Sequence, residues 1–332
     1  MKTLLLSALL LLPIASAQTA TPALPVTTPA TTAAPTAAAV LTLSAPVGTQ
    51  VELMTTTVSR TNISNVQVMA LPGSEVSAAD LADIKRSISA GMGGVGAVTV
   101  KGKQFYRVTA RDANGNVTLL SSVVQNVPGQ PPVTIKITQT VVWDGAVSGL
   151  KIQSDNPAVN AAFSGLAGEK LQELADQNGS NFAGVYGQPL AKGQPRSETI
   201  TLDASNILSG ALGVFAAQEE TLGLMDQVQS TPLRVMTTTT YGGLNVQGLH
   251  TFTQSSKYDR WNIKLGGGDG VPSVDVELAD GQASGTQTYR QDGLPGPTTQ
   301  KVRQVMNMTL EAEGVQVKLT LTIDQSVTAT LR

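Results

Sequence analysis

His250 is the only histidine in this 332-residue chain, and it limits the hydrolytic mechanisms that are open. A zinc site built from several histidines is excluded, and a Ser-His-acid triad would depend on this one side chain. His250 stands in the strand-like stretch Leu249-His250-Thr251-Phe252, and no serine occupies a G-x-S-x-G nucleophile elbow. A lone histidine on a strand is usually an ordinary surface or half-buried residue. The sequence therefore predicts no catalytic residue.

Carboxylate pairs and glycine-rich stretches are the other groups whose residue types could do chemistry. Glu219-Glu220, and Glu311 with Glu313, could serve a glycosidase only across a cleft of defined width, and we interpret both pairs as solvated acids. The stretch 266–270 lacks the Lys-Ser/Thr that follows the glycines of a phosphate-binding loop, and the stretch 91–96 follows a predicted helix instead of opening one, which is the wrong order for a dinucleotide site. We therefore expect two plain loops, no metal site and no cofactor.

The composition excludes two further classes of site. The chain has 22 basic and 24 acidic residues, and no cluster of more than two basic residues occurs. Nucleic-acid binding requires a basic stripe that neutralises phosphates, so we expect no nucleic-acid partner. The chain has no cysteine, so it has neither a disulfide framework nor a thiolate metal site.

The first residues have the pattern of an export signal. Lys2 is followed by an apolar run over residues 4–14 and by the small-residue cleavage site Ala15-Ser16-Ala17. The run is too short to cross a bilayer, which takes about 20 apolar residues. We predict that residues 1–17 are a signal peptide and that the mature chain, without a transmembrane segment, is periplasmic or extracellular. Export without cysteine favours a bacterial envelope.

Residues 18–39 consist almost entirely of Thr, Ala and Pro. Such a segment has too little apolar area to offset the conformational entropy lost on folding. The pattern predicts a disordered linker between the signal peptide and a β-rich globular region over residues 40–332.

Strand signals dominate the globular region. Short segments rich in Val and Thr, separated by Gly, Pro, Asn or Asp, predict strands at residues 40–43, 51–58, 66–69, 98–100, 105–109 and 117–124. The run 112–116 could ligate calcium through Asp112 and Asn114, but it lacks the distal glutamate, and its Asn-Gly pair predicts a hairpin turn. Residues 315–324 alternate apolar and polar side chains, which predicts a strand with one buried and one wet face.

An internal duplication is indicated by matching segments. Met54-Thr55-Thr56-Thr57 recurs as Met236-Thr237-Thr238-Thr239, and residues 133–141 resemble residues 315–323 at the same offset. Two distant segments thus share one register. We predict two related β halves at about 41–143 and 230–332, separated by a helical insert at about 150–229.

Three amphipathic stretches predict helices that could cover an apolar sheet face. One begins at Asn156-Pro157 and ends near Asn178-Gly179, and a second follows Ser205. The third runs over residues 78–89, is capped by Ser77 and has Leu81, Ile84 and Ile88 on its inner side.

These elements together predict a mainly β (α+β) fold, in which a large curved antiparallel sheet from two related halves packs on a few inserted helices. In this order the chain resembles the half-barrel carrier proteins of bacterial envelopes, which hold lipids between sheet and helices. More closely, it resembles uncharacterised exported bacterial β-rich proteins. The resemblance rests on this architecture and on the stretch from Leu166-Ala167-Gly168 to Gly187-Gln188-Pro189.

The leading functional hypothesis is an exported, noncatalytic envelope protein that binds an apolar or amphipathic ligand, such as a lipid, between sheet and helices. Phe163, Leu166, Leu212 and Phe215 would lie near the binding space, or would simply fill a dry core. The alternative is a structural or interaction protein of the cell surface, with residues 18–39 as its stalk and an envelope protein as its partner. A hydrolase that depends on His250 is the least favoured hypothesis.

Overall fold

The computed structural model describes residues 40–92, 97–126, 132–143, 145–157, 160, 185–202, 228–266 and 272–332. The predicted signal peptide, the predicted linker and most of the predicted helical insert lie outside these ranges. Within them the chain is mainly β, as predicted, and the one long helix is α2 (Ala78–Met92).

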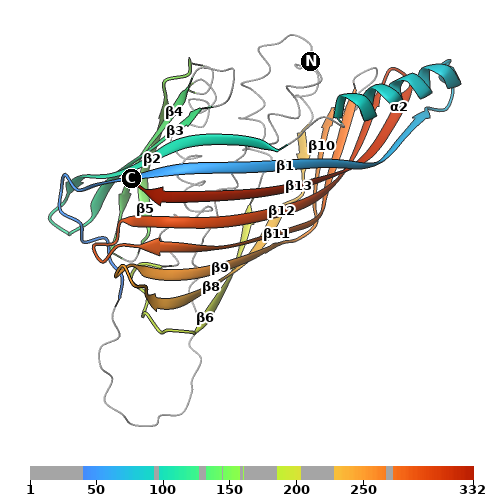
Figure 1. The fold of residues 1–332 in the computed structure, drawn as a ribbon. Helices are drawn as coiled ribbons and strands as arrows, with labels where there is room; N and C mark the ends of the chain where they lie inside the picture. The colour runs from blue at the N-terminus through green and yellow to red at the C-terminus, as the bar shows by residue number, and fades with distance from the viewer. Residues whose placement is uncertain are drawn as a thin grey trace.

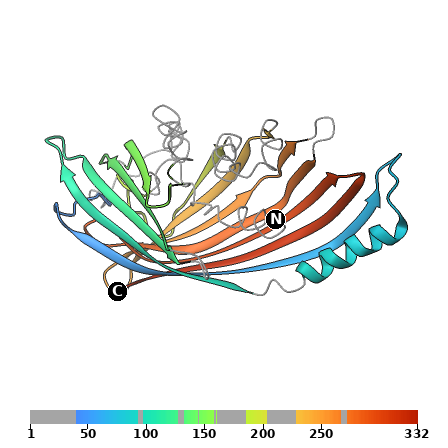
Figure 2. The same ribbon diagram turned by 90° about the horizontal axis from the view of Figure 1, so that it is seen from above.

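The described strands form a single 13-stranded sheet. In chain order they are β1 (Gln50–Ala70), β2 (Val98–Arg111), β3 (Val117–Asn126), β4 (Val133–Val141), β5 (Val147–Ser154), β6 (Pro195–Leu202), β7 (Val228–Ser230), β8 (Leu233–Leu244), β9 (His250–Tyr258), β10 (Trp261–Gly266), β11 (Ser273–Tyr289), β12 (Pro295–Ala312) and β13 (Val315–Leu331). Figures 1 and 2 show an open, strongly curved sheet.

The sheet order explains how two runs of strands become one surface. The order is β5-β4-β3-β2-β1-β13-β12-β11-β9-β8-β6, and β10 branches from β11 to pair with β7. Every pairing between these strands is antiparallel, and the central contact joins β1 to the C-terminal β13, from Leu53 opposite Leu331 to Ala70 opposite Val315. The first run of strands thus lies beside the last one. The predicted duplication of the two halves stays a prediction.

Two predicted pairs of short strands are in fact single long strands. The segments 51–58 and 66–69 both belong to β1, which absorbs the intervening Asn65 as a bulge with a φ of 55°. The segments 98–100 and 105–109 both belong to β2, where Gly102 lies in mid-strand. A Cβ atom at Gly102 would lie 2.5 Å from the carbonyl oxygen of Val124 in β3, so glycine permits a close approach rather than a turn.

Cross-strand register assigns the side chains to two faces, because directly opposite residues project to the same side. On β13, Val317, Leu319 and Leu321 project to what we call the apolar face, and Leu321 stands opposite Ile63 of β1 and Met306 of β12. The opposite side bears mainly Thr, Ser and charged residues, and we call it the hydroxyl face. The predicted alternation of residues 315–324 is confirmed, since Leu319 and Leu321 are buried and Lys318 is exposed.

The buried residues of the apolar face form two clusters at opposite ends of the strands. The helix-end cluster includes Val276, Met308, Leu319 and Leu321, and Leu81, Ile84 and Ile88 of α2 pack against it. The tyrosine-end cluster includes Val108, Leu119, Tyr106, Tyr186 and Tyr289. The apolar face therefore has two separate hydrophobic centres.

Helix α2 has the start that the sequence predicts. The backbone N–H of Asp80 donates to the Ser77 hydroxyl at 3.2 Å, and the N–H of Ser77 donates to the Asp80 carboxylate at 3.2 Å, which closes a reciprocal cap. The helix lies beside the C-terminal end of β1 (Figures 1 and 2). No helix in the described part of the chain is both long enough and apolar enough to cross a membrane.

The tyrosine end is covered by the segment before β1. The N–H groups of Ser44 and Ala45 donate to the carbonyl oxygen of Asp292 at 2.9 and 3.0 Å. The guanidinium of Arg111 donates to the carbonyl oxygens of Leu43 and Ala45 at 3.0 Å each. Residues 40–45 form only isolated bridges, not the predicted strand, because they cross over the sheet instead of extending it.

Candidate functional site

The residues predicted to line a ligand space cannot be placed. Phe163, Leu166, Leu212 and Phe215 lie outside the described residues, as do Glu219-Glu220 and most of the glycine-rich stretch 266–270. Of the first predicted inserted helix the described residues are 156, 157 and 160, and the N–H of Asn160 donates to the carbonyl oxygen of Asn156 at 2.9 Å. The site must therefore be sought on the sheet.

His250 lies at the start of β9 with a tyrosine as its neighbour. Its Nδ1 atom is 3.0 Å from the hydroxyl of Tyr241, and the two rings lie 5.8 Å apart. Partial burial lowers the pKa of His250, which favours the neutral imidazole. In the part of the chain that the structure describes, a phenol is thus the hydrogen-bonding neighbour of this histidine.

The acidic groups near turns serve local structure. Both oxygens of Asp112 accept hydrogen bonds within its turn, from the N–H groups of Asn114 and Asn116 at 2.9 Å and from the Asn116 amide at 2.8 Å. The Asn116 amide accordingly lowers the pKa of Asp112. The predicted hairpin turn between β2 and β3 is confirmed.

Glu311 and Glu313 do not form a pair on one strand. Glu313 has a φ of 52° and, with Gly314 at 77°, makes the two-residue turn between β12 and β13, whereas Glu311 accepts a hydrogen bond from Gln316 at 2.5 Å. Among the described residues no group of three or more His, Asp or Glu side chains could hold a metal ion.

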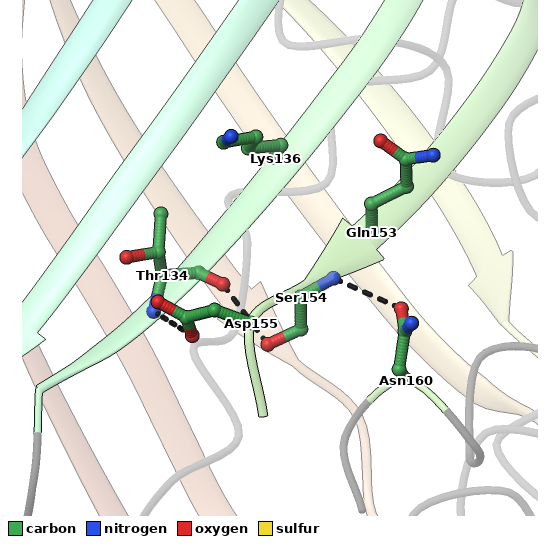
Figure 3. Close-up of a pocket in the computed structure, with 6 residues that line it drawn as sticks. All are labelled: Thr134, Lys136, Gln153, Ser154, Asp155 and Asn160. Carbon is green, nitrogen blue, oxygen red and sulfur yellow. Dashed lines mark hydrogen bonds between the residues drawn. The ribbon is translucent and has the colours of Figure 1, made fainter. Parts of the chain in front are cut away.

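A polar cavity of about 290 Å³ lies at the end of the β4–β5 pair (Figure 3). The N–H of Thr134 donates to Asp155 at 2.8 Å, the Ser154 hydroxyl donates to the Thr134 carbonyl at 2.9 Å, and the N–H of Ser154 donates to Asn160 at 3.0 Å. The bonds from Thr134 lower the pKa of Asp155, which is thus held as a carboxylate.

Most of the polar groups that line this cavity hydrogen-bond to one another and so join the ends of β4 and β5. Figure 3 shows Lys136 and Gln153 apart from the hydrogen-bonded group, and these cross-strand partners are the lining side chains left to meet a small polar molecule. Two groups fix orientation poorly, so the cavity is the weaker candidate site.

The stronger candidate is a band of polar side chains across the middle of the apolar face. One row runs from Ser59 on β1 and Gln325 on β13, through the apolar Val302 on β12 and Ala283 on β11, to Ser256 and Thr237 on β9 and β8. The adjacent row contains Gln300 and Gln254. We define the polar belt as Thr57, Ser59, Gln325, Gln300, Gln254, Ser256, Thr237 and Thr239. It lies between the helix-end cluster, whose Val302 and Ala283 stand in its first row, and the tyrosine-end cluster.

The two ends of the belt contain polar atoms without partners. In the part of the chain that the structure describes, the Ser59 hydroxyl oxygen and the Gln254 amide nitrogen are buried and make no hydrogen bond. By contrast, the hydroxyls of Thr237 and Ser256 lie 2.8 Å apart and satisfy one another. Ser59 and Gln254 are four strand spacings apart, or about 19 Å, so one small group could not meet both.

At the centre of the belt, β11 contributes only small residues to the apolar face. Gly281, Ala283 and Gly285 alternate along the apolar face of this strand. The ring of Tyr258 leans over Gly281, where a Cβ atom would lie 2.9 Å from the tyrosine Cβ. At Ala283 and Gly285, β11 therefore places nothing larger than a methyl group between the belt residues of β12 and those of β9.

The sequence did contain a signal for the belt. Val315 to Ile323 keep the apolar period of two, and Gln325 then takes the next position on the same face. Read alone, this looks like the end of a buried strand. Only the pairing of β13 with β1 and β12 shows that other polar side chains continue the row.

Comparisons with protein-family models, with curated proteins and with solved structures gave no match. The resemblance to half-barrel carriers therefore stays a prediction, and the functional argument depends on the geometry of the sheet.

Proposed function

We propose that this chain is an exported, noncatalytic protein of the cell envelope that binds an amphipathic ligand, such as a lipid, against the apolar face of its sheet. The ligand's polar group would lie at the polar belt and its apolar parts would extend over the two clusters. In this proposal Phe163, Leu166, Leu212 and Phe215 form the opposite wall.

The polar belt is the single observation that supports this proposal best. A buried polar group without a hydrogen bond costs about 1–3 kcal/mol, and an ordinary dry core avoids such groups. The belt places Ser59 and Gln254 between two hydrophobic clusters. A molecule with a polar group and long apolar parts matches this order of surfaces.

Native mass spectrometry of the mature protein, isolated from its own host's envelope, tests the proposal. We expect a stoichiometric passenger that denaturing extraction identifies as a lipid or a similar amphipath. N-terminal sequencing of the same sample should begin at Gln18, as predicted for the export signal. A protein mass without a passenger, together with no uptake of added phospholipid, would contradict ligand binding.

Matched variants tie the passenger to the belt. Gln254→Met keeps the side-chain length but removes the amide, and we expect about tenfold lower occupancy because a hydrogen bond to the ligand is lost. Gln282→Met makes the same change on the exposed hydroxyl face, between Gly281 and Ala283 of β11, and should leave occupancy unchanged. Equal losses in both variants would separate the passenger from the belt.

A further inference from the structure

Threonines lie in one row across the hydroxyl face. Six adjacent strands each contribute one, and each is the direct cross-strand partner of the next. In sheet order they are Thr56, Thr328, Thr299, Thr286, Thr253 and Thr240. Strands are about 4.8 Å apart, so this threonine row extends about 24 Å perpendicular to the strands. Thr328, Thr299 and Thr253 are exposed and the other three are half-buried.

A second row of hydroxyls runs beside the threonine row. It consists of Ser326, Ser284, Ser255, Thr238 and Ser197, with Lys301 between the first two. The hydroxyls of Ser197 and Thr238 lie 2.8 Å apart. The two rows together form a track of donors and acceptors that does not follow any single strand.

Positive charge gathers along this track, although the chain as a whole has slightly more acidic than basic residues. Lys101 extends the threonine row beyond Thr56, and Lys301 interrupts the second row. A third row lies beside the second on the same face and contributes Arg60, Arg303 and Lys257. Asp324 stands between Arg60 and Arg303 in this row, and its carboxylate is 3.8 Å from the guanidinium of Arg303. All five basic side chains are exposed.

We propose that the hydroxyl face binds an extended acidic polysaccharide that lies across the strands along the threonine row. Hydroxyl groups exchange hydrogen bonds with sugar hydroxyls and donate to carboxylates, while the flanking Lys and Arg side chains attract the charge. A linear chain can follow a curved sheet, whereas a flat bilayer would touch only part of it. The site is independent of the apolar face, so either proposal can fail alone.

Titration of the mature protein with polygalacturonate, a linear polymer of carboxylated sugars, tests the proposal. We expect binding at low salt that weakens steadily as salt screens the charges. Dextran, a neutral sugar polymer, should not bind. Equal binding of dextran, or no binding of polygalacturonate at low salt, would overturn the proposal.

Two triple variants with the same change in charge test the position of the site. Lys257→Gln, Lys301→Gln and Arg303→Gln together should weaken binding about 100-fold, since each basic group near an anionic surface contributes roughly a fivefold factor. Lys85→Gln, Arg86→Gln and Arg260→Gln remove as much charge from α2 and from the β9–β10 turn, and should change affinity less than about threefold. Equal losses would mean attraction by net charge alone.

The hydroxyls are tested separately from the charges. Thr286→Val with Thr299→Val keeps the β-branched shape and strand preference, and should weaken binding about tenfold without changing its salt dependence. Unchanged affinity would remove the threonine row from the site. Tighter binding of single-stranded DNA or of phosphatidylglycerol vesicles than of polygalacturonate would assign the face to another polyanion and overturn the polysaccharide.

Discussion

Along β13, Leu319 and Leu321 are 5% and 3% exposed, whereas Lys318 between Val317 and Leu319 is open to solvent. The same alternation continues across the neighbouring strands through their register. One face therefore buries side chains and supplies the free energy that holds the sheet, while the other keeps hydroxyls and charges in water. Substitutions on the two faces should consequently differ in what they change.

The two faces also place their polar residues differently. On the hydroxyl face polar side chains extend along whole strands, whereas on the apolar face a hydrophobic cluster lies on either side of the polar belt. This difference separates the two proposals. A partner of the hydroxyl face meets solvated groups, and a ligand of the apolar face must fit among buried ones.

The largest expected contrast is between adjacent residues of β13. Leu321→Ala removes a buried side chain of the helix-end cluster and should lower the free energy of unfolding by about 2–5 kcal/mol. Thr322→Ala, on the hydroxyl face, should change it by less than about 0.5 kcal/mol. Urea unfolding of both variants measures the difference. Similar losses would mean that the two faces are not distinct in packing.

Two glycines with nearly equal backbone angles test how the apolar face is covered. Gly293 and Gly115 have φ angles of 85° and 84°, so alanine is strained by about 1 kcal/mol at either position. At Gly293 a Cβ atom would also lie 2.8 Å from Cα of Leu43, in the segment that covers the tyrosine end, whereas at Gly115 nothing lies within 4 Å.

We therefore expect Gly293→Ala to destabilise the protein by about 2–4 kcal/mol and to expose residues 40–45 to proteolysis. Gly115→Ala should lose only about 1 kcal/mol and leave that segment protected. Thermal unfolding and limited proteolysis check both effects. Equal behaviour of the two variants would show that the contact with Leu43 contributes nothing.

Local patterns predicted the faces, one turn and one helix. Three features depend only on residues that are close together in the sequence, and could therefore be predicted from it. They are the alternation over residues 315–324, the turn at Asn114-Gly115 and the helix cap at Ser77. Strand length was different, because Asn65 and Gly102 resemble turn residues. In the sheet, β1 continues past Asn65 because Ser64 and Gln67 both pair with β13, and β2 continues through Gly102 because Gly102 pairs with Thr55 of β1 and Gln125 of β3.

Neither site on the sheet could be predicted, because each depends on register between distant strands. Thr56 and Thr328 are direct partners, although most of the chain separates them. A repeated sequence did not predict the same local structure at both of its positions. Asn65-Val66-Gln67 and Asn245-Val246-Gln247 match in sequence, but the first forms a bulge in β1 and the second forms the turn between β8 and β9.

Alkaline pH distinguishes buried polar groups of the apolar face from those in water. Burial raises the pKa of Tyr258 from 10.0 to about 12. Between these values the unfolded chain has lost the phenol proton and the folded chain has kept it, so the unfolded state binds fewer protons and stability falls as pH rises. At pH 11 the ionisation of Tyr258 in the unfolded chain should lower the free energy of unfolding by about 1.4 kcal/mol relative to neutral pH.

Tyr258→Phe should remove that part of the alkaline loss, so the variant should be less destabilised than the wild type between pH 9 and pH 11. Urea unfolding at several pH values measures the slope. Tyr241→Phe, in a less buried position, is the control and should change the slope less. An unchanged slope in Tyr258→Phe would mean that Tyr258 ionises in the folded protein as it does in water.

The smallest expected effect separates paired from unpaired serines within the polar belt. In protein stripped of any passenger, Ser256→Ala breaks the hydrogen bond to Thr237 and should cost about 1 kcal/mol. Ser59→Ala removes a buried oxygen that has no partner in the described structure, so stability should stay the same or rise slightly. After passenger is restored, the cost of Ser59→Ala should grow if the ligand's polar group meets Ser59. An equal cost of both substitutions in the stripped protein would show that Ser59 is already satisfied, and the belt would then lose one of its two reasons to bind a polar group.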